Sequence, residues 1–290
     1  MALMSNEGEP VTRWWVSQGL EIVKSERDIF TKAKMRAARL KFIAGANRLN
    51  TIKGWMASAQ LIDNQRTSRE YELTDFGYAI LTNDPKLAKS STWWAFHLSL
   101  CFSKISEPYP SFFLSLESIT KDWIDWNKLF TKIQTDLVDE TGKQYKDSTI
   151  ESLSSSVRKM LINGNPLAEL ALIESKKSPD DKRLSIRLGS PILSDEIIIH
   201  ALAMAKFSHF KSRDSIDFSK LIQETGLPHF LCCPKDQLRQ HLQRMSQMHK
   251  WQSYFSFDHA VDLNSISFKE NCDPNKTILL LLQKGQDTWL

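Results

Sequence analysis

The fold is decided by the stretch from Leu49 to Gly77, which reads LNTIKGWMASAQLIDNQRTSREYELTDFG. Its first part, up to Gln60, predicts a helix, because apolar residues recur there at the spacing of one helix face. The rest of the stretch predicts a short hairpin followed by another helix. The apolar positions of the first helix are Leu49, Ile52, Met56 and Ala59.

The hairpin is predicted from the order of its residues. The apolar pair Leu61-Ile62 comes first, a polar stretch follows, and Tyr71-Glu72-Leu73 then alternates apolar and polar side chains as a half-buried strand does. Thr74 comes next, and its hydroxyl can cap a helix over Asp75 to Leu81.

Two further helices are predicted before this stretch, over residues 14–27 and residues 30–44, and Gly45 ends the second. Three helices followed by a hairpin are the order of a winged helix-turn-helix, in which the third helix presents its N-terminal residues to the major groove of DNA. The expected apolar stripe of the second helix is Phe30, Ala33, Ala37, Leu40 and Ala44.

Positive charge is concentrated in the same part of the chain. The 290 residues include 38 Lys or Arg and 34 Asp or Glu, a net charge of +4. The segment from Thr31 to Arg69 contains nine Lys or Arg and one acid, Asp63, whereas the other 251 residues carry 29 basic and 33 acidic side chains. A basic segment on a mildly acidic body is typical of nucleic-acid binding, but a solvated basic helix without a partner has the same composition.

A set of basic and amide side chains on these elements is predicted to contact double-stranded DNA. Arg and Lys on the second and third helices suit phosphate or guanine, and Asn suits an adenine edge or phosphate. Basic residues at the hairpin tip suit the DNA backbone or the minor groove. A winged helix used only for protein contacts is the alternative. The predicted contact residues are Lys32, Arg36, Arg39, Arg48, Asn50, Lys53, Arg66 and Arg69.

The rest of the chain predicts more units of the same kind. Ser91 to Ser103 is apolar nearly all round, which indicates a central buried helix or a dimer face. The helix-and-hairpin order recurs from Trp123 to Leu188, and more weakly after Asp195. We therefore expect a mainly α (α+β) fold: an elongated array of winged-helix-like modules with short β-hairpins. The expected domains are an N-terminal winged helix-turn-helix DNA-binding module (10–88), a helical middle domain with a second winged-helix-like unit (89–193) and a C-terminal winged-helix-like module (194–290).

Signatures of common enzyme classes are missing from the sequence. It contains no G-x-G-x-x-G, Walker A or G-x-S-x-G motif, and no zincin histidine pair. The vicinal Cys232 and Cys233 are poorly spaced for zinc, so no metal site is predicted. His97 is expected to be a hydrogen-bonded core residue. The acidic pairs Asp139-Glu140, Asp180-Asp181 and Asp195-Glu196 are interpreted as loop, turn and helix-start residues, so no catalytic residue is assigned.

The cysteine content and the hydropathy indicate the cellular compartment of the protein. Four cysteines in a chain of this length indicate reduced thiols in a cytoplasmic protein. The first ten residues contain no apolar segment of a secretory signal, and no stretch reaches the ~20 apolar residues of a membrane span. We therefore expect a cytoplasmic protein without membrane association.

The order of several short segments resembles a known bacterial family, the domain of unknown function 4007 (DUF4007). The resemblance extends over about residues 15 to 285. It rests on the order and spacing of the segments rather than on one motif. The segments are Arg27-Asp-Ile-Phe, Ile52-Lys-Gly-Trp55, Tyr71-Glu-Leu-Thr-Asp-Phe-Gly, Asn83-Asp-Pro, Ser91-Thr-Trp-Trp-Ala-Phe-His97 and Asn165-Pro-Leu-Ala-Glu-Leu-Ala-Leu-Ile173.

This resemblance implies a role in bacterial DNA phosphorothioation, an antiphage system. Members of the family occur in such gene clusters, and one is described as a DNA-nicking subunit, whose nick helps sulfur to replace a non-bridging phosphate oxygen. The implied partners are double-stranded DNA, a cysteine desulfurase, an ATPase and an ATP-pyrophosphatase. If the chain itself nicks DNA, Mg²⁺ or Mn²⁺ is the expected cofactor.

Two other functions stay open from the residues themselves. One is a winged-helix transcription regulator. The other is a non-catalytic interaction scaffold, in which the helix with Trp93, Trp94 and Phe96, together with Trp123 and Trp126, forms a protein interface, for example in a homodimer.

Overall fold

The computed structural model describes residue 3 and residues 9–64, 70–116, 123–138, 142–162, 164–177, 183–260 and 263–284. Helices predominate in this part of the chain, and its strands form three small antiparallel sheets. The fold is therefore mainly α with small sheets, which confirms the predicted α+β class. None of the described helices has both the length and the apolar character needed to cross a membrane.

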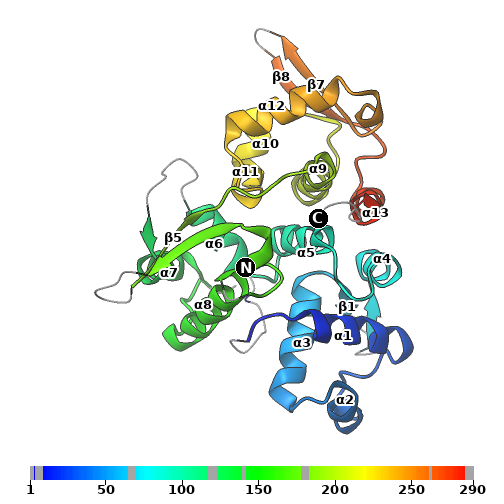
Figure 1. Ribbon diagram of the computed structural model, residues 1–290, viewed down its shortest axis with the longest axis vertical. Coiled ribbons are helices and arrows are strands. Elements are labelled where there is room, and N and C mark those ends of the chain that lie inside the picture. Colours follow the sequence, from blue (N-terminus) through cyan, green and yellow to red (C-terminus); the bar gives the residue numbers. More distant parts are fainter. Residues whose placement is uncertain are drawn as a thin grey trace.

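The N-terminal part of the chain forms three helices, a hairpin and a fourth helix, shown in blue to cyan in Figure 1. The hairpin pairs Ile62 with Leu73, as the alternation of side chains predicts. The elements are α1 (Arg13–Ser25), α2 (Met35–Phe42), α3 (Ala46–Ser58), β1 (Ile62–Asn64), β2 (Tyr71–Leu73) and α4 (Asp75–Asn83).

The helix α1 packs closely against both α3 and α4. A Cβ atom at Gly19 on α1 would lie 2.3 Å from Met56 Sδ on α3, so only glycine allows this approach without a shift of the Met56 side chain. Thr74 caps α4 as predicted, because its Oγ1 accepts a hydrogen bond from the Gly77 amide at 3.1 Å. The same hydroxyl donates to the Gln60 carbonyl at 2.6 Å and thereby ties α4 to the end of α3.

The second helix is shorter than predicted. Residues 27–34 form turns instead of helix, and α2 covers only Met35–Phe42. These turns bury Phe30, whose ring stacks on Phe42 with centroids 5.6 Å apart. Burial of Phe42 directs Ala38, one turn earlier, to the core. The predicted stripe through Leu40 is therefore wrong, and the Leu40 side chain is 74% exposed.

The middle part of the chain places a short strand between its first and second helices. The sheet order is β3-β5-β4, so this short strand pairs with the last strand of the hairpin that follows. The elements are α6 (Tyr109–Ser115), β3 (Ile124–Asp125), α7 (Trp126–Asp136), α8 (Asp147–Ile162), a 3₁₀ turn (Ala168–Leu170), β4 (Ile173–Lys177) and β5 (Leu184–Leu188).

The C-terminal part repeats this order. Its sheet order is β6-β8-β7, and the short strand β6 again pairs with the last strand. The elements are α9 (Asp195–His209), β6 (Ser215–Asp217), α10 (Phe218–Thr225), α11 (Leu227–Phe230), α12 (Lys235–Ser246), a 3₁₀ turn (His249–Trp251), β7 (Phe255–Ala260) and β8 (Leu263–Phe268).

The helix α5 (Ser90–Phe102) forms the centre of the protein (Figure 1). Every side chain from Ser91 to Phe102 is buried, and α5 packs against α6 and α9. Trp93 and Trp94 are 0% and 3% exposed, so they belong to the core of this chain. The aromatic interface that an interaction scaffold requires is therefore not formed by this helix.

The last described helix is α13 (Pro274–Lys284), which was not predicted from the sequence. It packs on α9, α5 and α4, and the Asn275 side chain donates to Asp75 Oδ2 on α4 at 2.8 Å. The helix-and-hairpin units lie around α5, and α13 lies at the edge of the molecule between α9 and α4 (Figure 1), which differs from the elongated array expected from the sequence.

Two buried histidines hydrogen-bond within this core. His97 Nε2 lies 2.7 Å from the Phe230 carbonyl, so it carries the proton, and Nδ1 accepts from the Tyr109 hydroxyl at 2.9 Å. His200 Nδ1 lies 2.9 Å from Thr277 Oγ1 and joins α9 to α13. Burial lowers the pKa of each imidazole to about 4, so both are neutral near pH 7. His97 is the satisfied core residue that the sequence predicts.

Candidate nucleic-acid interface

The basic surface of the N-terminal part is centred on α2. Lys32, Arg36 and Arg39 are exposed, and none forms an ion pair with a described residue. Arg36 and Arg39 are three residues apart and thus share one side of the helix. Other cations of this region are paired and contribute less net charge. These pairs are Lys34 with Asp28, at 3.7 Å, and Lys41 with Glu26.

The helix α3 presents a second row of side chains. Asn50 and Lys53 are half-buried and lie on one stripe with Ala46 and Ala57, whereas Leu49 and Ile52 point into the core. Because α3 begins at Ala46, three residues earlier than predicted, Asn50 and Lys53 lie in the body of the helix.

Arg48 does not join this stripe. Its guanidinium lies over the Trp15 ring, 4.4 Å from the centroid, and Nη1 is 3.7 Å from Glu9 Oε2. The Glu9 carbonyl accepts hydrogen bonds from Trp55 Nε1 at 3.0 Å and from Ser156 Oγ at 2.9 Å, and these bonds hold the chain segment around Glu9 against α3 and α8. Part of the Arg48 charge is thus balanced within the chain. The sequence pattern gave no sign of the contact with Trp15.

The uncapped backbone amides at the N-terminus of α3 are a feature that the sequence pattern did not indicate. Gly45 occupies the N-cap, no side chain caps the helix, and a Cβ atom at Gly45 would meet nothing within 4 Å. The first-turn amides of this 13-residue helix therefore add positive potential at the turn that joins α2 to α3. Arg66 and Arg69 of the predicted set lie outside the described residues.

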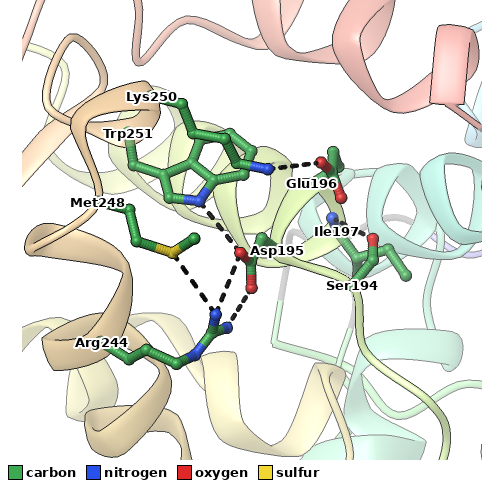
Figure 2. Close-up of polar contacts among 8 residues, drawn as sticks. All are labelled: Ser194, Asp195, Glu196, Ile197, Arg244, Met248, Lys250 and Trp251. Carbon is green, nitrogen blue, oxygen red and sulfur yellow. Dashed lines mark hydrogen bonds and ion pairs between the residues drawn. The ribbon is translucent and has the colours of Figure 1, made fainter.

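Figure 2 shows that Asp195 and Glu196, the acidic pair at the start of α9, both form contacts with side chains of the same chain. Asp195 accepts hydrogen bonds from Trp251 Nε1, at 3.1 Å, and from the Arg244 guanidinium. Glu196 is buried and pairs with Lys250, with Nζ 3.4 Å from Oε1. Ser194 caps the helix, so the predicted helix start is confirmed. The pairs Asp139-Glu140 and Asp180-Asp181 lie outside the described residues.

The cysteines offer no activated nucleophile. All four are buried and free of disulfides. Cys233 lines a cavity of about 620 Å³ together with His241 and Arg187, and burial raises the pKa of its thiol to about 11. The Cys232 thiol donates to the Leu172 carbonyl at 3.2 Å. Across the described residues, no group of three His, Cys, Asp or Glu side chains is placed to hold a metal ion.

These features define a mainly helical protein of helix-and-hairpin units with a basic helical surface in its N-terminal part. The chain belongs to the family described as protein of unknown function DUF4007, whose model matches residues 10–282. This is the family that the sequence resembles.

Two solved structures share the fold over nearly the whole chain. The crystal structure of magnesium ion-bound SspB matches with a TM-score of 0.77 at 17% identity, and covers 99% of this chain and 88% of that one. Another SspB crystal structure matches with a TM-score of 0.73 at 17% identity, and covers 98% and 87% of the two chains. Identity at this level establishes similarity of fold. No curated protein matches the chain significantly.

Proposed function

We propose that this chain is the DNA-binding component of a bacterial DNA phosphorothioation system and binds double-stranded DNA through α2 and α3. The observation that carries the proposal is the set of exposed, unpaired cations Lys32, Arg36 and Arg39 on or next to α2, together with the uncapped N-terminus of α3, the helix that follows α2 in the chain. Phosphate groups bind both kinds of donor, side-chain cations and helix N-terminal amides. A role in phosphorothioation is supported by membership of the DUF4007 family and by the SspB-like fold.

The order of elements supports a winged-helix interpretation of each unit. In the middle and C-terminal units, a strand after the first helix pairs with the last strand of the hairpin, as in winged-helix proteins. In the N-terminal unit no such strand is formed by the described residues, but the Arg27 carbonyl occupies its place and accepts from the Tyr71 amide at 2.9 Å. With this topology, α3 is the helix that enters the major groove.

Binding is tested by fluorescence anisotropy with a labelled mixed-sequence duplex. Arg36→Ala combined with Arg39→Ala is expected to weaken binding about tenfold at moderate salt, since two phosphate contacts are removed. Lys86→Ala combined with Lys269→Ala is the matched control, because these lysines are also exposed but lie on other surfaces. Equal affinity of both double variants would contradict the assignment of the interface to α2.

Strand nicking is the finer activity that family membership suggests. It is tested by incubating the chain with supercoiled plasmid and Mg²⁺ or Mn²⁺, with EDTA as the control. Open circles that disappear with EDTA support a metal-dependent nickase. Binding without open circles assigns the chemistry to the proposed partners, which are the cysteine desulfurase, the ATPase and the ATP-pyrophosphatase of such systems.

A further inference from the structure

The turn between α2 and α3 exposes two large apolar side chains. Leu40 is 74% exposed in the last turn of α2, and Ile43 is 84% exposed at its C-cap. Both residues lie at the end of α2, where Leu40 is still helical and Ile43, three residues later, already has left-handed backbone geometry. Together Leu40 and Ile43 form what we call the apolar tip.

The backbone at Ile43 makes this choice of residue unfavourable for folding. Ile43 has φ 48° and ψ 47°, in the left-handed region. A β-branched side chain is disfavoured there, and glycine is the usual residue at such a helix end. The turn is closed by main-chain bonds, since the Ala44 amide donates to the Arg39 carbonyl at 3.1 Å. The exposed Ile43 side chain therefore adds little to the stability of the fold.

The surroundings of the apolar tip suit a polyanion. Arg36 lies one turn before Leu40 on α2, and Arg39 is its chain neighbour. On the other side, Ile43 precedes Gly45 at the open N-terminus of α3. An uncharged apolar partner would leave these positive groups without counter-charges. DNA offers phosphates to the cations and, in the major groove, the thymine C5-methyl group to an apolar side chain.

We infer that Leu40 and Ile43 contact thymine methyl groups in the major groove and thereby give the chain a preference for thymine. The inference rests on the proposed binding of DNA through α2 and α3, because the apolar tip directly precedes the end of α3 that enters the groove. Contact with a methyl group is independent of counterion release, so its loss changes affinity without changing the salt dependence.

The test combines a protein variant with a DNA variant. Ile43→Gly removes the apolar side chain and relaxes the left-handed residue, so the variant is expected to fold with an unchanged or higher Tm. The DNA variant is the same mixed-sequence duplex amplified with dUTP in place of dTTP, which lacks only the methyl groups. Wild-type protein is expected to bind the deoxyuridine duplex about fourfold more weakly per methyl contact. Ile43→Gly is expected to retain only the part of this preference that Leu40 provides.

The outcomes separate this inference from the proposed function. If wild-type protein binds thymine and deoxyuridine duplexes equally, or if Ile43→Gly retains the full preference, the apolar contact is refuted while DNA binding stands. If wild-type protein binds neither duplex, the proposed function fails and the inference fails with it. A smaller preference for the thymine duplex in Ile43→Gly than in wild-type protein supports the contact.

Discussion

Acidification is expected to destabilise the folded chain through His97 and His200, which are 0% and 3% exposed. Burial lowers the pKa of both imidazoles to about 4, whereas a histidine of the unfolded chain titrates near ~6.5. Since the folded-state pKa is the lower one, the unfolded chain takes up the proton first. The stability is therefore complete above ~pH 6.5 and is lost as the pH falls toward about 4.

The magnitude follows from the difference between the two pKa values. At about pH 5 each histidine is mostly protonated in the unfolded chain and mostly neutral in the folded one, which lowers the free energy of unfolding by about 2 kcal/mol. Two independent sites give about 4 kcal/mol. Glu107 acts in the opposite direction, because burial raises the pKa of its carboxyl and acid then favours the folded state. A variant that removes one imidazole separates these effects.

The assay is urea unfolding followed by tryptophan fluorescence, at about pH 7.5 and about pH 5. His97→Gln is expected to lose about 2 kcal/mol less than wild-type protein between these pH values, because an amide can still hydrogen-bond but does not titrate. His249→Gln, at an exposed position, is the control and is expected to behave like wild type. Equal losses in His97→Gln and wild-type protein would refute the reasoning.

Further predictions concern packing and capping, and urea unfolding measures each of them. Gly77→Ala places a Cβ atom 2.2 Å from the Leu61 carbonyl oxygen, so we expect the free energy of unfolding to fall by about 1–3 kcal/mol. A rise in the free energy of unfolding, as helix propensity alone predicts, would contradict this clash. Asp195→Ala leaves Trp251 Nε1 and the Arg244 guanidinium without their acceptor, and we expect a loss of about 2 kcal/mol. The control for Asp195→Ala is Lys220→Ala, which breaks an exposed ion pair with Glu224. This control is expected to change the free energy of unfolding by less than about 0.5 kcal/mol. Similar losses in both variants would contradict the importance of the Asp195 contacts.

Local patterns predicted much of this structure. The pairing of Ile62 with Leu73 and the cap at Thr74 depend on residues within a few positions of each other, so alternation and capping rules were sufficient. The start of α9 at Asp195 was predicted for the same reason. The exposed cations Arg36 and Arg39 were likewise visible from helical spacing, although their contact with DNA stays a prediction.

Contacts between distant segments decided what the sequence could not predict. The exposure of Leu40 follows from the stacking of Phe42 on Phe30, which shortens α2. Arg48 turns toward Trp15 and Glu9 because the N-terminal segment lies against α3. The helix α13 is stabilised by α4, α5 and α9, which are far away in the chain, so the short apolar run from Ile278 to Leu282 gave no sufficient signal in the sequence. The expected domain boundaries at 88 and 193 stay predictions.

The salt dependence of DNA binding tests the central claim most directly. The logarithm of the binding constant falls linearly with the logarithm of the salt concentration, by about 0.9 for each phosphate contact. If Arg36 and Arg39 each neutralise a phosphate, Arg36→Ala combined with Arg39→Ala is expected to reduce the slope by about 1.8 relative to wild-type protein. Lys86→Ala combined with Lys269→Ala is expected to leave the slope unchanged. Equal slopes for wild-type protein and the Arg36/Arg39 variant would contradict binding of DNA through α2.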